Sequence, residues 1–179
     1  MNNLITTAEL RKLGRPIGKV ADDKLEAFIN EAEQLHIKPI IGDKLYLDLQ
    51  KEVEVVEDGE KNEALQLLLN GGTYYENEGG SDETIRSFSG LKVAISYFVY
   101  AQNLMVGDIE STRYGSVVKN GDFSDRLSSK ERSDAYNKTL EAANAFLKEC
   151  LAYCREKELI TSAGKPTASL GGIYIKKIG

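Results

Sequence analysis

The chain has 179 residues, of which 41% are hydrophobic and 28% are charged, so it can bury a core without disulfide bonds. Its 28 acidic residues outnumber its 23 basic residues, and the net charge of -5 disfavours sequence-independent binding to nucleic-acid phosphates. The opening residues lack the charged, apolar and small-residue regions of a secretory signal, so we expect a cytosolic chain.

The first two predicted helices have recognisable boundaries. Thr6 or Thr7 can cap the first helix, and Gly14 ends it. Asp22 or Asp23 supplies the cap of the second helix, and we expect Pro39 to end it, because proline lacks the amide hydrogen that a helix needs. The apolar period predicts one buried face on this second helix, made of Leu25, Phe28, Ile29, Ala32, Leu35 and His36.

Two further short helices follow. One begins at Asp43, and the other runs over residues 64–69 and closes at Gly71-Gly72. The acidic segment Lys51–Glu63 between them is predicted to be a solvated connection. The polar, glycine-containing segment Thr73–Ser89 predicts a loop with at most one weak hairpin.

The most apolar stretch of the chain runs from Gly90 to Gly107. On a helix, its apolar side chains cover most of the circumference and leave a thin polar stripe of Lys92, Ser96 and Asn103. A helix of this kind must be surrounded by protein. It is too short to span a bilayer, which needs about 20 apolar residues, so we interpret it as the central helix of a bundle.

A second long helix is predicted near the end of the chain. The capping box of Ser128 and Glu131 marks its start, and it should run to about Lys157. The segment before it, the arm of residues 109–124, has β-branched residues and glycines but no helical period. We expect an extended arm or a short strand pair, with a tight turn at Asn120-Gly121. The apolar seam of the long helix consists of Tyr136, Leu140, Ala143, Leu147, Cys150 and Cys154.

Composition changes after residue 160, so we divide the chain into a helical domain of residues 1–160 and a tail of residues 161–179. The tail ends in a strand-like peptide, Gly172–Ile178, which needs a partner: either an extended segment of the domain or another protein. The predicted fold class is mostly α, a small helical bundle with a central apolar helix, a long C-terminal helix, an irregular arm and a short β-like C-terminal tail.

No arrangement of catalytic or metal-binding residues is evident. His36 is the single histidine and falls on the apolar side of a helix, where packing is the simpler interpretation. Cys150 and Cys154 lack further ligands for zinc, and the acidic segment lacks the spacing of a calcium loop. We therefore expect no catalytic residues, no cofactor and no metal.

The order of features resembles the head-tail connector (adaptor) proteins of bacteriophages and prophages, in the form common in Bacteroidetes phages. The resemblance spans most of residues 6–157 and lies in the Asp22–Ala32 helix, the Gly71-Gly72 turn, the Gly90-Leu91-Lys92 start of the apolar helix with Tyr97 and Tyr100, the Thr112–Lys119 arm and the long final helix.

That resemblance implies a non-enzymatic structural protein of the virion neck, present in the host bacterial cytoplasm during assembly. Such adaptors form a ring of about twelve subunits on the portal protein, extend the DNA channel and present a surface to the next connector or stopper protein. The chain could be monomeric until a portal organises it. Packaged DNA would pass through without specific binding, and no membrane is involved.

The residues expected to make interfaces come from the arm and the tail. Arg113 and Lys119 are candidates for charged contacts within the ring, and the tail peptide is expected to pair as an added strand with a neighbour or with the portal. The full set of interface candidates is Thr112, Arg113, Tyr114, Lys119, Ile173, Tyr174, Ile175 and Lys176.

Two alternatives remain open from the sequence. The first is a helical protein-interaction module unrelated to phage. The second is a small carboxylate-dependent enzyme using Glu26 or Glu31 with Asp48, which predicts a deep pocket and perturbed acidic pKa values.

Overall fold

The computed structural model describes residues 3–14, 16–17, 20–54, 61–106, 109–112, 115–118 and 128–160 of the chain. The helical elements are α1 (Thr7–Lys12), α2 (Asp22–Ala32), the π-helical segment η1 (Glu33–Ile37), α3 (Lys38–Ile41), α4 (Asp43–Glu54), α5 (Glu63–Asn70), α6 (Leu91–Val106) and α7 (Ser129–Glu156). The strands are β1 (Gly72–Glu76), β2 (Thr84–Phe88), β3 (Ile109–Thr112) and β4 (Gly115–Val118).

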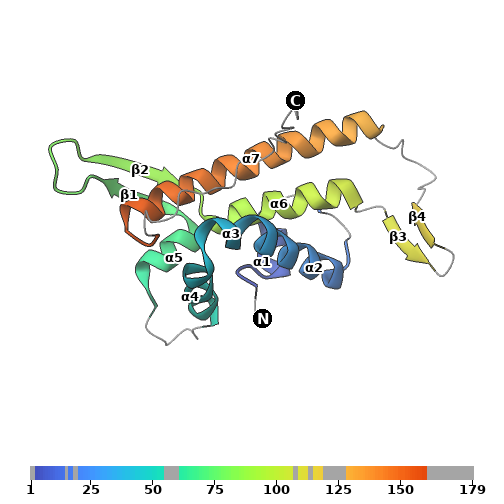
Figure 1. Ribbon diagram of the computed structural model, residues 1–179, viewed down its shortest axis with the longest axis horizontal. Coiled ribbons are helices and arrows are strands. Elements are labelled where there is room, and N and C mark those ends of the chain that lie inside the picture. Colours follow the sequence, from blue (N-terminus) through green and yellow to red (C-terminus); the bar gives the residue numbers. More distant parts are fainter. Residues whose placement is uncertain are drawn as a thin grey trace, which may run out of the picture.

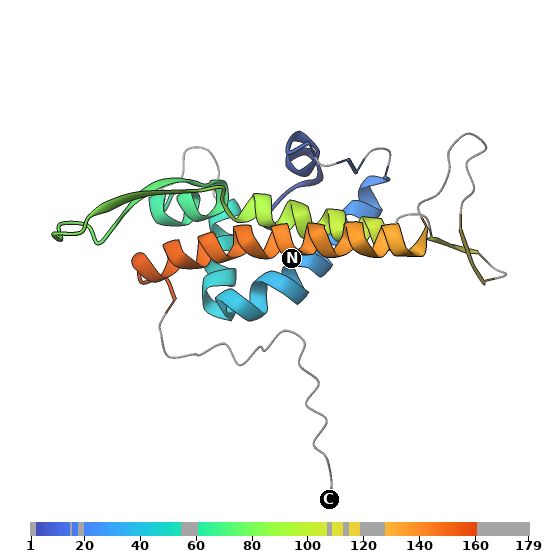
Figure 2. The same cartoon turned by 90° about the horizontal axis from the view of Figure 1, so that it is seen from above.

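The predicted central helix, α6, lies in the middle of the molecule between α7 and the N-terminal helices (Figure 1). It runs antiparallel to α7, and Figure 2 shows the two helices side by side along the long axis. Its core positions are buried because protein covers it on two sides; they are Leu91, Ala94, Ile95, Phe98, Val99 and Ala101. The mostly helical fold and the central place of α6 are therefore confirmed.

The polar stripe predicted for α6 is only partly right. Lys92 forms an ion pair with Glu9 of α1, with 2.6 Å between Nζ and Oε1. This pair connects the N-terminal helix to α6. Ser96 is fully buried rather than solvated, and its hydroxyl donates to the carbonyl of Val93 at 2.7 Å. That hydrogen bond satisfies the hydroxyl and permits its burial.

The long final helix has the predicted bounds. Ser128 and Glu131 form the capping box, and α7 ends at Glu156 with Lys157 as its C-cap. Along the predicted seam, Ala143, Leu147, Cys150 and Cys154 are buried, whereas Tyr136 and Leu140, nearer the start of the helix, are half-buried. Tyr153 is also buried and was absent from the predicted seam.

The second predicted helix differs most from expectation, because Pro39 does not end it. The chain continues through η1 and α3, and Gly42, with φ of 86°, is the residue that ends the helical run. Pro39 follows the wider π turn, in which the amide of Lys38 donates to the carbonyl of Glu33, five residues back. A wider turn accommodates a ring that would clash in a regular α-helix.

The π turn also changes which side chains are buried. Leu35, predicted on the buried face, is 66% exposed, whereas Glu33 and Ile37 are fully buried. The cap was wrong as well: Ala21 is the N-cap and makes no side-chain bond, while Asp22 lies in the first turn and pairs with Arg11.

The remaining short helices follow the sequence closely. Thr6 caps α1 in a capping box with Glu9, α4 starts at Asp43, and α5 closes at Gly71. The acidic connection is wrong at its beginning, because Glu52 is buried within α4. Its Oε1 accepts from the amide of Asn62 at 3.0 Å and from Gln66, which joins α4 to α5.

The two long helices α6 and α7 form the spine of the molecule. Two antiparallel hairpins extend from opposite ends of this spine (Figure 1). The segment predicted as a loop with a weak hairpin forms a five-pair ladder, with Gly72 opposite Phe88 and Glu76 opposite Thr84. In the arm, β3 and β4 form the expected strand pair, with Thr112 opposite Gly115. Residues 113–114 between the two strands and the predicted turn at Asn120-Gly121 lie outside the described residues.

The tail of residues 161–179 also lies outside the described residues. Within the described part of the chain, no helix has the length and apolar character needed to cross a membrane.

Candidate functional site

The β1–β2 hairpin leaves the helical body through a neck of two glycines. Gly71, between α5 and β1, and Gly90, between β2 and α6, have φ of 82° and 85°. A Cβ on Gly90 would lie 2.3 Å from the amide nitrogen of Gly71, and a Cβ on Gly71 would lie 2.4 Å from the carbonyl carbon of Ser89. Only glycine permits the two backbones to cross this closely.

One face of the hairpin packs on the end of α7 through aromatic rings. The ring of Tyr74 meets those of Phe88 and Tyr153 edge-on, with centroids 5.8 and 5.2 Å away. Phe88 and Tyr153 stack at 4.8 Å, and the Tyr153 hydroxyl donates to the carbonyl of Ala64 at 3.1 Å. These buried contacts fix the base of the hairpin against α5 and α7.

Polar contacts hold the outer half of the hairpin. The amide of Asn77 donates to Glu156 Oε1 at 2.9 Å, and Lys157 Nζ lies 3.0 Å from Glu78 Oε2. Arg86 pairs across the strands with Glu76 at 2.8 Å. The hairpin is therefore positioned along its length by the last turn of α7.

The opposite face of this hairpin is open to solvent. We name it the hairpin face and define it by the alternating residues Thr73, Tyr75, Ile85 and Ser87, all exposed. Tyr75 and Ile85 are direct cross-strand partners and are 45% and 63% exposed. An apolar pair on a two-stranded sheet is a surface suited to binding protein. Tyr75 and Ile85 can be recognised as neighbours on one face only once the strand register is known.

The predicted interface residues are placed by the structure only in part. Thr112 is the last residue of β3, at the opposite end of the spine from the hairpin face. Arg113, Tyr114 and Lys119 lie outside the described residues, and so does the tail peptide with Ile173, Tyr174, Ile175 and Lys176.

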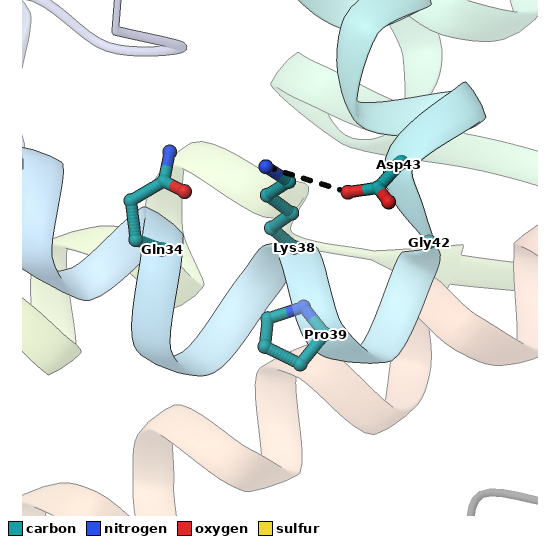
Figure 3. Close-up of a pocket in the computed structure, with 5 residues that line it drawn as sticks. All are labelled: Gln34, Lys38, Pro39, Gly42 and Asp43. Carbon is teal, nitrogen blue, oxygen red and sulfur yellow. Dashed lines mark ion pairs between the residues drawn. The ribbon is translucent and has the colours of Figure 1, made fainter.

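Two hollows of the described surface are open rather than enclosed. One, of about 360 Å³, is lined by Gln34, Lys38, Pro39, Gly42 and Asp43 and is spanned by an ion pair of 3.3 Å between Lys38 Nζ and Asp43 Oδ1 (Figure 3). A second, of about 450 Å³, lies between α4, α5 and the chain after α7. Neither encloses a small molecule as a binding cavity does.

The carboxylates proposed for the enzyme alternative lie on different surfaces. Glu26 and Glu31 are exposed on α2, whereas Asp48 lines the second hollow together with Lys44 and Lys51. Neither glutamate lines that hollow. Glu26 and Glu31 therefore share neither of these two hollows with Asp48.

A different acid, Glu33, occupies the interior. Its Oε1 accepts from the amide of Leu4 and its Oε2 accepts from the hydroxyl of Tyr46, both at 2.7 Å. Burial raises the pKa of Glu33 to about 7, although both hydrogen bonds lower it. Because the side chain bonds to the N-terminal segment and to α4, the arrangement holds three parts of the chain together. Sequence analysis missed it, since Glu33 reaches the interior only through the π turn.

The single histidine and the two cysteines are packed residues. The ring of His36 stacks on Phe98 with centroids 4.3 Å apart, and burial lowers its pKa. Cys150 and Cys154 are buried thiols whose pKa values burial raises to about 12, which keeps them protonated. Among the described residues, no three His, Cys, Asp or Glu side chains gather as metal ligands would.

Comparison with known proteins gives a family but no activity. No curated protein matches the chain, and no solved structure matches it. The model of a family of unknown function, DUF6712, matches residues 37–161, which include α4 to α7 and both hairpins. Since this match covers well over half of the sequence, the chain belongs to the DUF6712 family.

Proposed function

We propose that this protein is a structural connector of a bacteriophage or prophage neck, which assembles as a ring of about twelve copies on the portal protein. The observation that carries the proposal is the shape: a spine of α6 and α7 with a hairpin projecting from each end (Figure 1). The order of sequence features that resembles phage adaptors supports the same role.

A ring requires two different surfaces on each subunit, because each copy contacts the next one head to tail. The β1–β2 hairpin and the β3–β4 hairpin extend in opposite directions and differ in sequence. They therefore offer the two unlike surfaces that such a contact needs. Projecting strands suit this purpose because they reach a neighbour without disturbing the helical body.

Charge supports the proposal in a second way. The chain has a net charge of -5, so a ring of these subunits would be strongly negative overall. A negative wall repels phosphates, and DNA passing through it would slide rather than bind.

The partners proposed are the portal on one side and the next connector or stopper protein on the other.

Electron microscopy of the chain mixed with the portal protein from the same genome tests the proposal. We expect a ring of about twelve copies seated coaxially on the portal, as closed cyclic symmetry requires. Replacing residues 109–118 by a Gly-Ser linker of equal length should abolish the ring and leave the helical circular dichroism signal unchanged. A portal that remains bare at saturating concentrations of the unaltered chain would overturn the proposal.

A second candidate, a helical interaction module unrelated to phage, is favoured by one observation. The exposed Tyr75 and Ile85 pair would serve any protein partner, inside or outside a virion. The neighbouring genes distinguish the two: genes for a portal, a capsid protease and a tail tube support the connector, and their absence supports the module.

A further inference from the structure

The β1–β2 hairpin lacks a third strand within the described part of the chain. It forms a two-stranded sheet, and no other described strand pairs with it. Four of the five residues of β2, Ile85 among them, are exposed, and Tyr75 of β1 is open to solvent beside them. A sheet with open edges is a template for an additional strand, and a third strand stabilises a hairpin.

We propose that the chain's own tail supplies this strand: Ile173–Ile178 adds to an outer edge of the β1–β2 sheet of the same molecule. The inference is independent of the proposed role in a virion. A strand-like tail has several possible partners. Of these, the β1–β2 sheet lies nearest to the beginning of the tail.

The starting point of the tail supports docking within one molecule. The chain after α7 is fixed to the body, because the amide of Leu159 donates to the carbonyl of Cys154 at 2.9 Å and Ile160 packs against the core. Lys157, three residues earlier, contacts Glu78 in the turn of the hairpin. The 12 residues between Ile160 and Ile173 span up to about 40 Å when extended, which exceeds the roughly 17 Å length of a five-residue strand.

Charge complementarity also favours this occupant. The tail carries three lysines, Lys165, Lys176 and Lys177, and no acidic side chain. Residues 72–88 of the hairpin carry a single basic residue, Arg86, against four acidic residues, Glu76, Glu78, Asp82 and Glu83. An acidic hairpin attracts a basic strand and repels the acidic remainder of other copies.

The alternation of the tail peptide matches the two faces of the sheet. In an extended strand, Ile173 and Ile175 point to one face, and Tyr174 and Lys176 point to the other. Placing the two isoleucines on the hairpin face would extend the apolar pair of Tyr75 and Ile85. Lys176 would then lie on the face that carries Glu76.

Amide hydrogen exchange of the full-length chain, alone in solution, tests the inference. The comparison is between Ile173→Asp/Ile175→Asp and the control Ala163→Asp/Ala168→Asp, which adds the same charge outside the proposed strand. A tether of this length gives an effective concentration on the order of a millimolar, so we expect residues 72–88 to exchange roughly tenfold faster in the first variant only. Residues of α6 should exchange equally in both variants.

Three further results decide the matter. A synthetic peptide of residues 171–179, added at millimolar concentration to Ile173→Asp/Ile175→Asp, should restore the protection, whereas a scrambled peptide should not. Protection in the unaltered chain should be independent of protein concentration. Equal exchange of the hairpin in both variants would overturn the proposal, and protection that grows with concentration would do so too, since it would assign the strand to a second copy. Because no portal is present, neither result bears on ring assembly.

Discussion

At the scale of single residues, Glu33 gives the stability of the protein a dependence on pH. Its pKa is about 7 in the folded chain and near 4.5 when unfolded. Below pH 4.5 the side chain is neutral in both states, and its contribution to stability is fully present. As the pH rises through 7, the unfolded state ionises first, so stability falls by up to about 3 kcal/mol.

Glu33→Gln should remove this fall. The glutamine carbonyl still accepts from Leu4, and the side chain has no proton to lose. Urea unfolding at pH 4.5 and pH 8 measures the difference, which should be smaller in Glu33→Gln by about 3 kcal/mol. The exposed Glu31→Gln, two residues away, is the control and should retain the fall. An unchanged pH dependence in Glu33→Gln would show that folding does not shift the pKa of Glu33.

The glycine neck yields a second prediction, with a control matched in backbone conformation. Gly90 and Gly42 have φ of 85° and 86°, but a Cβ on Gly42 would meet nothing within 4 Å, whereas one on Gly90 would meet the backbone of Gly71. Gly42→Ala should therefore cost about 2 kcal/mol, for the positive-φ conformation alone. Gly90→Ala should cost about 4 kcal/mol or prevent folding. Urea unfolding of both variants checks this, and equal costs would mean that the neck opens to admit a methyl group.

The buried face of the second helix shows where prediction from residues fails. Leu35 fits a regular helical period and Glu33 does not, yet Glu33 is buried and Leu35 exposed. One wide turn, next to Pro39, shifts the side-chain period, and a pattern search that assumes 3.6 residues per turn cannot detect it. Upstream of that turn, Leu25, Phe28, Ile29 and Ala32 are buried as predicted.

At the scale of elements, the start of α7 depends on its capping box. The hydroxyl of Ser128 accepts from the amide of Glu131 at 3.2 Å, and Glu131 Oε2 accepts from the amide and the hydroxyl of Ser128. These bonds lower the pKa of Glu131. Ser128→Ala should destabilise the protein by about 1 kcal/mol.

Hydrogen exchange resolves where that loss occurs. Amides in the first turns of α7 should exchange faster in Ser128→Ala, because these turns are less buried than the rest of the helix and fray first. Ser133→Ala, an exposed position inside the helix, serves as control and should leave both exchange and stability nearly unchanged. Equal behaviour of the two variants would mean that packing on α6, rather than the cap, fixes this end.

Several element boundaries, though not those of α2, were predicted well by local chemistry. The caps at Thr6 and Ser128, the start at Asp43 and the glycine end at Gly71 are each encoded within a few residues. The sequence predicted at most a weak hairpin where β1 and β2 form a five-pair ladder. The ladder depends on Tyr74 and Phe88 packing against Tyr153, which is distant in sequence.

At the scale of the whole molecule, assembly should depend on the two basic residues of the arm. We predict that Arg113→Glu/Lys119→Glu weakens ring formation on the portal, because it replaces local attraction between the basic arm and an acidic neighbouring subunit by repulsion. Titration of the portal at two salt concentrations, followed by electron microscopy, measures the effect. The matched change Lys130→Glu/Lys138→Glu on α7 should have a smaller effect, and equal loss in both would indicate that net charge, not the arm, controls assembly.

The candidate site could be predicted less well than the fold. The central and final helices follow from the apolar pattern and the capping residues of the sequence, whereas the hairpin face exists only because a strand register places Tyr75 opposite Ile85. A register is set by contacts at both ends of a hairpin, and a short polar segment does not encode it by period.

The crossing of Gly71 and Gly90 has a consequence for how related chains can diverge. Because both strands enter and leave the body at one point, residue pairs can be inserted or removed beyond it without moving a helix. Each added pair would advance the tip by about 3.4 Å. The length of the hairpin can therefore vary independently of the helical core, so that homologues with identical cores could span gaps of different width.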